Sequence, residues 1–207
     1  MNALTAPVIV LLSCAMGSVL ADEAVSVCYN YSCAREQQVS FSEARLAGIG
    51  ETLAAATTAE RERALLALVI GRMYAWAGEQ SPIKADRGGN FADEGVVGAM
   101  DCIDHSTTTT RLLRLLEARG WLRFHRVLEP VRRTRFLIFQ HLSAAIEELP
   151  PRWLQPLSGV EPDGKPEAAP PTDGLPRYVV DSWFVDNGQP AVILPLQEWL
   201  KGGGPHV

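Results

Sequence analysis

Apolar residues recur at helical spacing in two stretches of the first half of the chain. Each stretch begins with the Ser/Thr-x-x-Glu spacing of a capping box, at Ser40–Glu43 and at Thr57–Glu60. The apolar side chains of the second stretch fall on one stripe, made by Leu66, Val69, Ile70, Met73 and Trp76. The pattern predicts two helices, over 41–56 and 58–78, that pack one face on a core.

A third helix is predicted over 102–119. Asp101 precedes it as an N-cap, Asp104 occupies its third position, and Gly120 follows its end. The threonine run 107–110 has low helix propensity, so tertiary packing must stabilise this helix.

Beyond Gly120 the apolar period shifts toward two, which is typical of strands. Four strands are predicted, over 121–128, 134–147, 177–186 and 191–194. The tripeptide Asp186-Asn187-Gly188 has the composition of a hairpin turn between the last two strands. Helices followed by strands define an α+β domain, with N-terminal helices packed on a mostly antiparallel sheet.

Proline concentrates in one segment between the second and third predicted strands. Eight of the fourteen prolines lie between Glu148 and Arg177, and proline at this density excludes a regular helix or strand. Strand patterns on both sides make this segment, at about 149–176, a surface insertion rather than a boundary between domains. We therefore expect a single domain over residues 22–207.

The first 21 residues have the features of a secretory signal peptide. Val8–Leu20 is an apolar run of 13 residues, which suits the central region of a signal peptide and is short for a membrane span. Val19 and Ala21 are small residues at the positions that precede a cleavage site. We expect cleavage after Ala21 and a periplasmic or secreted protein. A retained anchor and lipidation at Cys14 are the alternatives.

Acidic residues outnumber basic ones, 24 to 19, for a net charge of −5. This balance argues against a protein that binds nucleic acid through bulk positive charge. Arginines concentrate between Arg111 and Arg135 at a spacing that favours a solvated face bordering the core. The alternative is recognition of an acidic partner or of peptidoglycan carboxylates, with association with the cell envelope.

Export to an oxidising compartment changes what the cysteines imply. Removal of the signal peptide leaves Cys28, Cys33 and Cys102. Cys28 and Cys33 flank the tetrapeptide Tyr-Asn-Tyr-Ser, a spacing that can close a small disulfide loop. Cys102 then has no cysteine to pair with, and it is either a reactive thiol or an inert buried one.

Cys102 stands where the surroundings favour a nucleophile. The free amides and the dipole of a helix start stabilise a thiolate, whereas the carboxylates of Asp101 and Asp104 oppose it. A compensating base is therefore needed. His141 is the main candidate because it interrupts an otherwise apolar strand, and His105 on the same helix is the alternative.

Asp181 supplies the third residue. It lies inside the apolar run Tyr178–Phe184, where a carboxylate needs a cation or a polarised N–H group as its partner. A cysteine at a helix start, a histidine on one strand and an aspartate on another can act as nucleophile, base and orienter. We set aside His125, in a strand expected to be partly exposed, and His206, in a tail expected to fray.

Three motifs around these residues resemble the transglutaminase-like superfamily, and most closely the bacterial transglutaminase-like cysteine proteinases. They are Gly98-Ala-Met-Asp-Cys102-Ile-Asp-His-Ser, Gln140-His141-Leu and Tyr178-Val-Val-Asp181-Ser-Trp, and the resemblance covers about residues 90–200. It implies a papain-like cysteine protease fold, with Cys102 as nucleophile, His141 as base and Asp181 as orienter.

The resemblance also implies a function. The expected protein is an exported cysteine hydrolase or acyl transferase that attacks an amide bond of a protein or peptide substrate and passes through a thioester. The alternative is a domain of the same fold that has no turnover and serves in binding or as an envelope scaffold.

The resemblance carries over less well to a metal site and to an oxyanion site. Some relatives bind calcium through acids near the cysteine, but Ile103 replaces one of them and only Asp101 and Asp104 match. We therefore expect no cofactor and no metal, with these two acids as the candidates if calcium binds. Apart from the Cys102 amide, the side chain of Asn90 is the candidate oxyanion donor.

Overall fold

The computed structural model describes residues 22–135, 139–150 and 174–205. The predicted signal peptide with Cys14, most of the proline-rich insertion, and His206 lie outside the described residues. Within them, no helix combines the length and the apolar composition that a membrane span requires.

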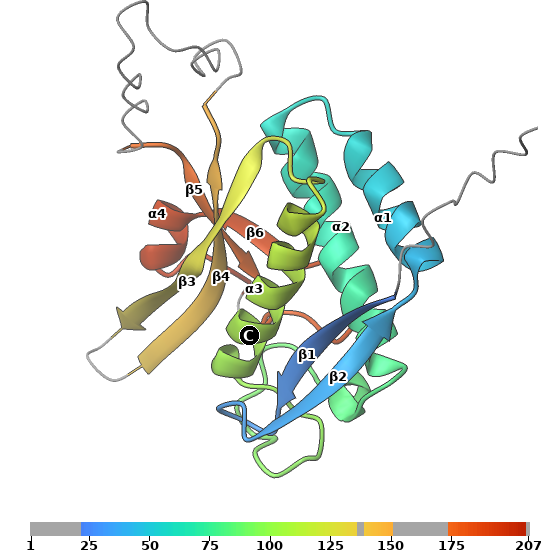
Figure 1. Ribbon diagram of the computed structural model, residues 1–207. Coiled ribbons are helices and arrows are strands. Elements are labelled where there is room, and N and C mark those ends of the chain that lie inside the picture. The colour runs from blue at the N-terminus through green and yellow to red at the C-terminus, as the bar shows by residue number, and fades with distance from the viewer. Residues whose placement is uncertain (1–21, 136–138, 151–173, 206–207) are drawn as a thin grey trace, which may run out of the picture.

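The described chain is an α+β domain (Figure 1), as the sequence predicts. Its elements, in chain order, are β1 (Glu23–Tyr29), β2 (Arg35–Phe41), α1 (Glu43–Ala54), α2 (Ala59–Gly78), the 3-10 helix η1 (Pro82–Ala85), α3 (Cys102–Ala118), β3 (His125–Arg135), β4 (Phe139–Glu148), β5 (Arg177–Asp181), β6 (Val192–Pro195) and α4 (Leu196–Leu200). Strands β3 to β6 form one sheet in that order, and β1 and β2 form a separate hairpin. All of these neighbouring strands are antiparallel.

The predicted starts of α1 and α2 are off by two residues and one residue, because their side-chain caps are Ser42 and Thr58. Helix α3 begins as predicted. Asp101 caps it, and Asp104 completes a capping box by accepting the amide of Asp101. Gly120, just past its end, has a φ of 69°, the left-handed conformation that glycine adopts readily at this position.

Helix α3 lies between the β1–β2 hairpin and the four-stranded sheet, because it packs on β1 on one side and on β3 and β4 on the other (Figure 1). The main core lies between the helices and one face of the four-stranded sheet, and its fully buried members include Leu66, Ile70, Met73, Leu112, Leu116 and Ile146. A smaller apolar cluster lies on the opposite face and contains Val179, Trp183, Phe184 and Trp199. The neighbours Val180 and Val179 fall in different clusters, as strand alternation requires.

The N-terminal hairpin is an element that the sequence analysis did not predict. Its strands pair from Glu23 opposite Phe41 to Tyr29 opposite Arg35. Their inward side chains are buried at alternate positions, but polar residues fill the outward positions of two short strands and weaken the signal. Cys28 and Cys33 close the turn with a disulfide, which confirms the predicted pairing.

The strand boundaries differ from the prediction on both sides of the insertion. Strand β3 begins at His125 and continues to Arg135, and β5 already ends at Asp181. The predicted turn at Asp186 does form, since the N–H of Gln189 donates to the Asp186 carbonyl at 3.0 Å. It lies within a longer connection, 182–191, so β5 and β6 are not joined by a tight hairpin.

The C-terminal segment packs against the sheet instead of fraying. Helix α4, which the sequence analysis did not predict, buries Trp199 completely. The Arg133 guanidinium donates to the carbonyl oxygens of Trp199, at 2.6 Å, and of Gly203, at 2.9 Å. Hydrogen bonding to a charged group therefore holds the glycine-rich tail in place.

Candidate active site

Strand register brings His141 and Asp181 to the same face of the sheet. In the antiparallel pair of β4 and β5, Ala145 lies opposite Val179. Alternate residues of a strand share a face, so His141 lies on the face of Ala145 and Asp181 on the face of Val179. This is the face that carries the smaller apolar cluster, and the two polar side chains therefore meet beside aromatic rings.

The imidazole and the carboxylate make a direct contact. His141 Nε2 lies 2.7 Å from Asp181 Oδ2, and Asp181 is 1% exposed. The indole N–H of Trp199 donates to the same oxygen at 2.9 Å, and the backbone N–H of Trp183 donates to Oδ1 at 3.3 Å. The carboxylate is thus held from three sides, and its contact with Nε2 leaves the Nδ1 nitrogen of His141 for another partner.

Cys102 is the residue that reaches His141 from α3. It is a free, partly buried cysteine that packs against the smaller apolar cluster, and it lies close enough to His141 to raise the pKa of that ring. Asp101 keeps the helix start in place by accepting the amides of Ile103 and Asp104 at 3.0 and 2.9 Å. The structure therefore brings together the three residues that the sequence analysis chose.

The pKa of His141 is raised to about 9. Burial favours the neutral ring, but the hydrogen bonds to Asp181 and Cys102 and the negative charges of both groups outweigh it. The imidazole is therefore protonated at neutral pH. An imidazolium that contacts the Asp181 carboxylate and lies near the Cys102 sulfur is suited to stabilise the thiolate form of that sulfur.

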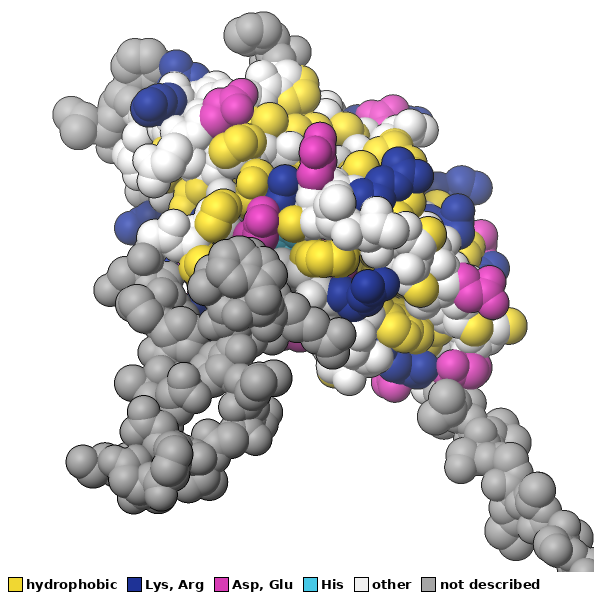
Figure 2. Space-filling model, turned by 90° about the horizontal axis from the view of Figure 1, so that it is seen from above, with side chains coloured by type: hydrophobic (Ala, Val, Ile, Leu, Met, Phe, Trp, Pro, Cys, Tyr) yellow, Lys and Arg dark blue, Asp and Glu magenta, His cyan; other side chains and the backbone are white. Residues whose placement is uncertain are grey.

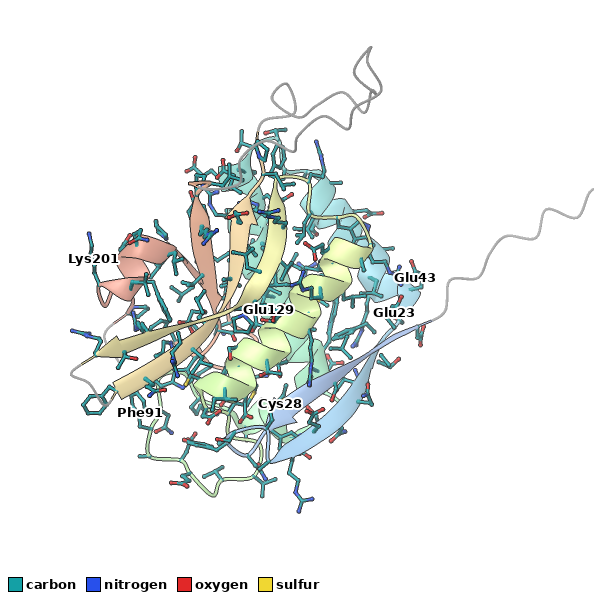
Figure 3. The ribbon with its side chains drawn as sticks, turned by 60° about the vertical axis from the view of Figure 1, so that its left-hand side comes forward. Glu23, Cys28, Glu43, Phe91, Glu129 and Lys201 are labelled. Carbon is teal, nitrogen blue, oxygen red and sulfur yellow. A yellow bond between two sulfur atoms is a disulfide. The ribbon has the colours of Figure 1, made fainter. Side chains whose placement is uncertain are left out.

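A cleft of about 400 Å³ opens beside His141. Aromatic side chains form much of its wall, and two arginines lie on it; these residues are Phe91, Phe139, Trp183, Phe184, Arg133 and Arg135. Phe91, labelled in Figure 3, is 76% exposed and packs on Trp183 at a centroid distance of 4.7 Å. The cleft offers apolar contact area next to the candidate base, as a binding site for a peptide would.

Another hollow and the general surface offer less chemistry. A hollow of about 500 Å³ near Gly174–Tyr178 has no histidine or cysteine among its described lining residues. On the face drawn in Figure 2, basic and acidic side chains are interspersed with hydrophobic ones. That face has no broad basic surface of the kind that binds a polyanion.

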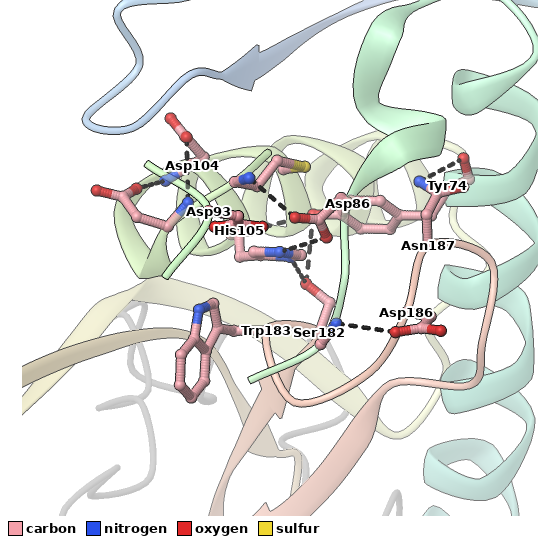
Figure 4. A network of polar contacts seen from close by, with 12 residues as sticks. Tyr74, Asp86, Asp93, Asp104, His105, Ser182, Trp183, Asp186 and Asn187 are labelled. Atoms are coloured by element: carbon pink, nitrogen blue, oxygen red, sulfur yellow. Dashed lines mark hydrogen bonds and ion pairs between the residues drawn. The ribbon is translucent and has the colours of Figure 1, made fainter. Parts of the chain in front are cut away.

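His105 does not reach Cys102, because both of its ring nitrogens have other partners. Its Nε2 lies 3.0 Å from Asp86 Oδ2, and its Nδ1 lies 2.8 Å from the hydroxyl of Ser182 (Figure 4). The ring is 3% exposed. The alternative that His105 is the base is therefore corrected: it is a hydrogen-bonded interior histidine.

The hydrogen-bond network around His105 links the chain just before Cys102 to the chain just after Asp181. The other oxygen of Asp86 accepts the amide of Met100 at 2.8 Å, two residues before Cys102. Ser182, which also contacts Thr109, directly follows Asp181. The sequence analysis did not identify Asp86 or Ser182. Asp86 lies in a turn-rich segment and Ser182 in a strand-like run, and neither setting indicated a hydrogen-bond network.

His125 is also buried, against the expectation of a partly exposed strand. It is 1% exposed, and its Nδ1 lies 2.7 Å from Glu62 Oε2. The guanidinium of Arg63 approaches its other nitrogen at 3.1 Å. His125 therefore belongs to a polar cluster with Glu62 and Arg63 of α2. This cluster lies on the main-core side of the sheet, so His125 is not part of the candidate active site.

Asp101 and Asp104 do not offer free oxygens to a calcium ion. Asp104 accepts the amides of Tyr31 and Cys33, at 2.8 and 2.5 Å, with a different oxygen for each. Asp101 accepts the amide of Ser32 at 3.0 Å with one oxygen and caps α3 with the other. Calcium binds through oxygen lone pairs, and here N–H groups point at those lone pairs, so these two acids do not fit the ion.

Asn90 is not among the residues that line the cleft beside His141. Its side-chain oxygen accepts the amide of Ala92 at 2.9 Å and so shapes its own loop. The role of Asn90 as an oxyanion donor stays a prediction. The amides of Ile103 and Asp104 already donate to Asp101, which leaves the Cys102 amide as the candidate donor at the start of α3.

Comparison with known protein families, with curated proteins and with solved structures finds no match to this chain. The indications of its function are therefore those of its own side chains. Three observations bear on it: the contact of His141 with Asp181, the position of Cys102 near the same ring, and the cleft that His141 lines.

Proposed function

We propose that this protein is an exported cysteine hydrolase or acyl transferase of the transglutaminase-like superfamily, with a papain-like fold and a protein or peptide substrate. The observation that carries the proposal is the 2.7 Å contact of the His141 imidazole with Asp181, with Cys102 close enough to the same ring to raise its pKa. The α+β architecture, with a helix start that presents the cysteine to an antiparallel sheet, supports the superfamily assignment.

In the proposed reaction, the Cys102 thiolate attacks the carbonyl carbon of an amide bond and forms a C–S bond. The C–N bond breaks, and the leaving amine takes a proton from the His141 imidazolium. Water or a second amine then attacks the thioester carbon, the neutral imidazole accepts the proton of the attacking group, and the C–S bond breaks to restore the Cys102 thiolate. Asp181 fixes the ring through Nε2 and stabilises its charged form.

The oxyanion of the tetrahedral intermediate needs a donor near the attacked carbon. The amide of Cys102 at the start of α3 is suited to this role, because that helix end also carries a partial positive charge. A side chain from the loop before α3, with Asn90 as the candidate, would have to turn toward the cleft to add a second hydrogen bond.

Export is part of the proposal. The Cys28–Cys33 disulfide supports a chain that folds in an oxidising compartment, periplasmic or extracellular. The predicted signal peptide would deliver the chain there and be removed after Ala21. No metal or other cofactor enters the proposed reaction.

A covalent test distinguishes the enzyme from a binding or envelope-scaffold domain of the same fold. Incubation with p-nitrophenyl acetate should acylate Cys102, because an activated ester reports on the nucleophile without requiring the natural substrate. Peptide mass spectrometry should place a hydroxylamine-sensitive adduct on Cys102, with none in the Cys102→Ala variant. Absence of the adduct in the wild-type protein would favour the non-catalytic alternative.

A further inference from the structure

The turn between β1 and β2 has an unusual backbone. Asn30, Tyr31, Ser32 and Cys33 have φ angles of 65°, 64°, 57° and 52°. Residues other than glycine rarely adopt this left-handed conformation, and a run of them is unfavourable without external support. The Cys28–Cys33 disulfide closes the turn and brings the two Cα atoms to 4.7 Å.

The turn directs its backbone amides at the start of the nucleophile helix. The N–H groups of Tyr31 and Cys33 donate to Asp104, and that of Ser32 donates to Asp101. Consecutive amides that converge in this way form a concave site for an anion. Here the anions are the two carboxylates that flank Cys102.

The same turn also holds the segment just before Cys102. The N–H of Asn30 donates to the carbonyl of Ala99 at 2.8 Å, and its side-chain oxygen accepts the amide of Gly98 at 2.9 Å. The turn therefore contacts the chain on both sides of the cysteine. Any shift of the turn would move the start of α3 and the segment that leads into it.

The two carboxylates would otherwise work against the thiolate. Asp101 and Asp104 lie one residue before and two residues after Cys102, and like charges at this range disfavour a third negative group. Burial raises the pKa of Asp104 to about 6, against the effect of the amides that donate to it. A positive partner for these acids is needed, and the amides of Tyr31, Ser32 and Cys33 supply N–H dipoles to them.

We infer that the disulfide-closed turn 28–33 is the positioning element of Cys102, that it takes the place of a cation beside Asp101 and Asp104, and that the reactivity of Cys102 depends on the Cys28–Cys33 disulfide. The inference rests on the proposed function, in which Cys102 is a nucleophile, and adds a means of regulating it. Calcium has no part in this arrangement.

Reduction of the disulfide is the regulating step. An external dithiol gives two electrons and two protons, Cys28 and Cys33 become thiols, and the dithiol becomes a disulfide. The reduced turn regains the freedom that the crosslink removed, so its left-handed residues relax and their amides leave the acids. Two uncompensated carboxylates then lie beside Cys102, and the segment 98–102 loses its support.

The test is the rate at which iodoacetamide alkylates Cys102 at pH 7, where Asp104 is largely ionised in the wild-type protein, followed by peptide mass spectrometry. The Cys28→Ala/Cys33→Ala double variant should react at least fivefold more slowly than the oxidised wild-type protein. Adding Ser32→Gly to the double variant should recover part of the rate, because glycine adopts the left-handed conformation without strain. Leu65→Ala, a core truncation in α2 away from the turn, controls for a general loss of stability and should leave the rate unchanged.

Hydrogen exchange provides a second readout. In the double variant the amides of Tyr31, Ser32 and Cys33 should exchange at least tenfold faster, while amides of α2 keep their protection. Calcium chloride and a chelator should both leave the wild-type rate unchanged. A rate that falls on chelation would overturn the inference in favour of a bound cation.

The remaining outcomes separate the inference from the proposed function. A double variant that reacts as fast as the wild type would overturn the inference and leave the proposed function standing. Global unfolding of the double variant would also count against it, since the turn would then serve the whole fold rather than Cys102. A wild-type Cys102 that reacts no faster than a cysteine in the denatured chain would defeat both.

Discussion

The Asp86→Ala variant is expected to lose about 3 kcal/mol of unfolding free energy, because the substitution leaves two buried donors without an acceptor. These donors are the Met100 amide and the His105 ring, which lie 2.8 and 3.0 Å from the Asp86 carboxylate. Asp86 is 0% exposed, so water does not replace it in the intact fold. Urea denaturation measures the loss.

Two variants sharpen this prediction. Asp86→Asn keeps an oxygen for the Met100 amide and can donate its N–H to a His105 ring in the other tautomer, so it should lose less than half as much. Glu94→Ala, an exposed acid in the same loop, should change stability by less than about 0.5 kcal/mol. If Asp86→Ala were as stable as Glu94→Ala, the network would not support the candidate site.

Glu62→Ala is expected to cost about 3 to 5 kcal/mol, the range for breaking a buried hydrogen-bonded pair. The fully buried carboxylate accepts the amides of Arg123 and Phe124, at 2.7 and 3.1 Å, as well as the His125 ring. It therefore ties α2 to the start of β3. Removal would leave three donors unsatisfied at the edge of the main core.

Glu60, two residues earlier on the same helix and exposed, provides the matched control for Glu62. Glu60→Ala should change the unfolding free energy by less than about 0.5 kcal/mol. Thermal or urea unfolding of the two variants side by side measures the difference. A loss below about 1 kcal/mol for Glu62→Ala would show that the cluster around His125 relaxes or admits water.

Local signals were enough to predict the start of α3 and the proximity of His141 and Asp181. The cap at Asp101 and the glycine at 120 are short-range features, and they bound the helix correctly. Polar residues inside two apolar strand patterns indicate a shared need for a partner. Antiparallel pairing of the strands then places the two side chains on one face.

The contacts that the sequence did not reveal are long-range ones. Trp199 donates to Asp181 from a five-residue helix, α4, that has too little periodicity to be recognised. His105, Asp86 and Ser182 come from three separate segments, and only tertiary packing brings them together. A sequence pattern reports the burial of a polar residue better than it reports which residue satisfies it.

Asp101 and Asp104 are a further case in which the sequence pattern did not reveal the long-range partners. Their spacing around a cysteine resembles a family feature that holds calcium in some relatives, whereas in this chain a hairpin that was not predicted supplies backbone amides to them. The polar pattern of β2 and the disulfide spacing were visible, but no local signal links residues 30–33 to α3.

The central claim is that Cys102 and His141 form a thiolate–imidazolium pair, and the rate of Cys102 alkylation by iodoacetamide as a function of pH tests it most directly. His141 has a raised pKa of about 9, so the imidazolium persists at every pH below that value and is lost as the pH rises through it. At pH 6, wild-type Cys102 should react at least about tenfold faster than in His141→Ala, because an ordinary thiol with a pKa of ~8.5 is then almost fully protonated.

Asp181→Asn should lie between the two proteins, since it leaves the imidazole without its orienting carboxylate. The difference between wild type and His141→Ala should shrink above pH 9, where His141 is neutral in the wild type. A wild-type Cys102 that alkylates only above about pH 8, at a rate unchanged in His141→Ala, would contradict the account and leave the three residues as a structural cluster.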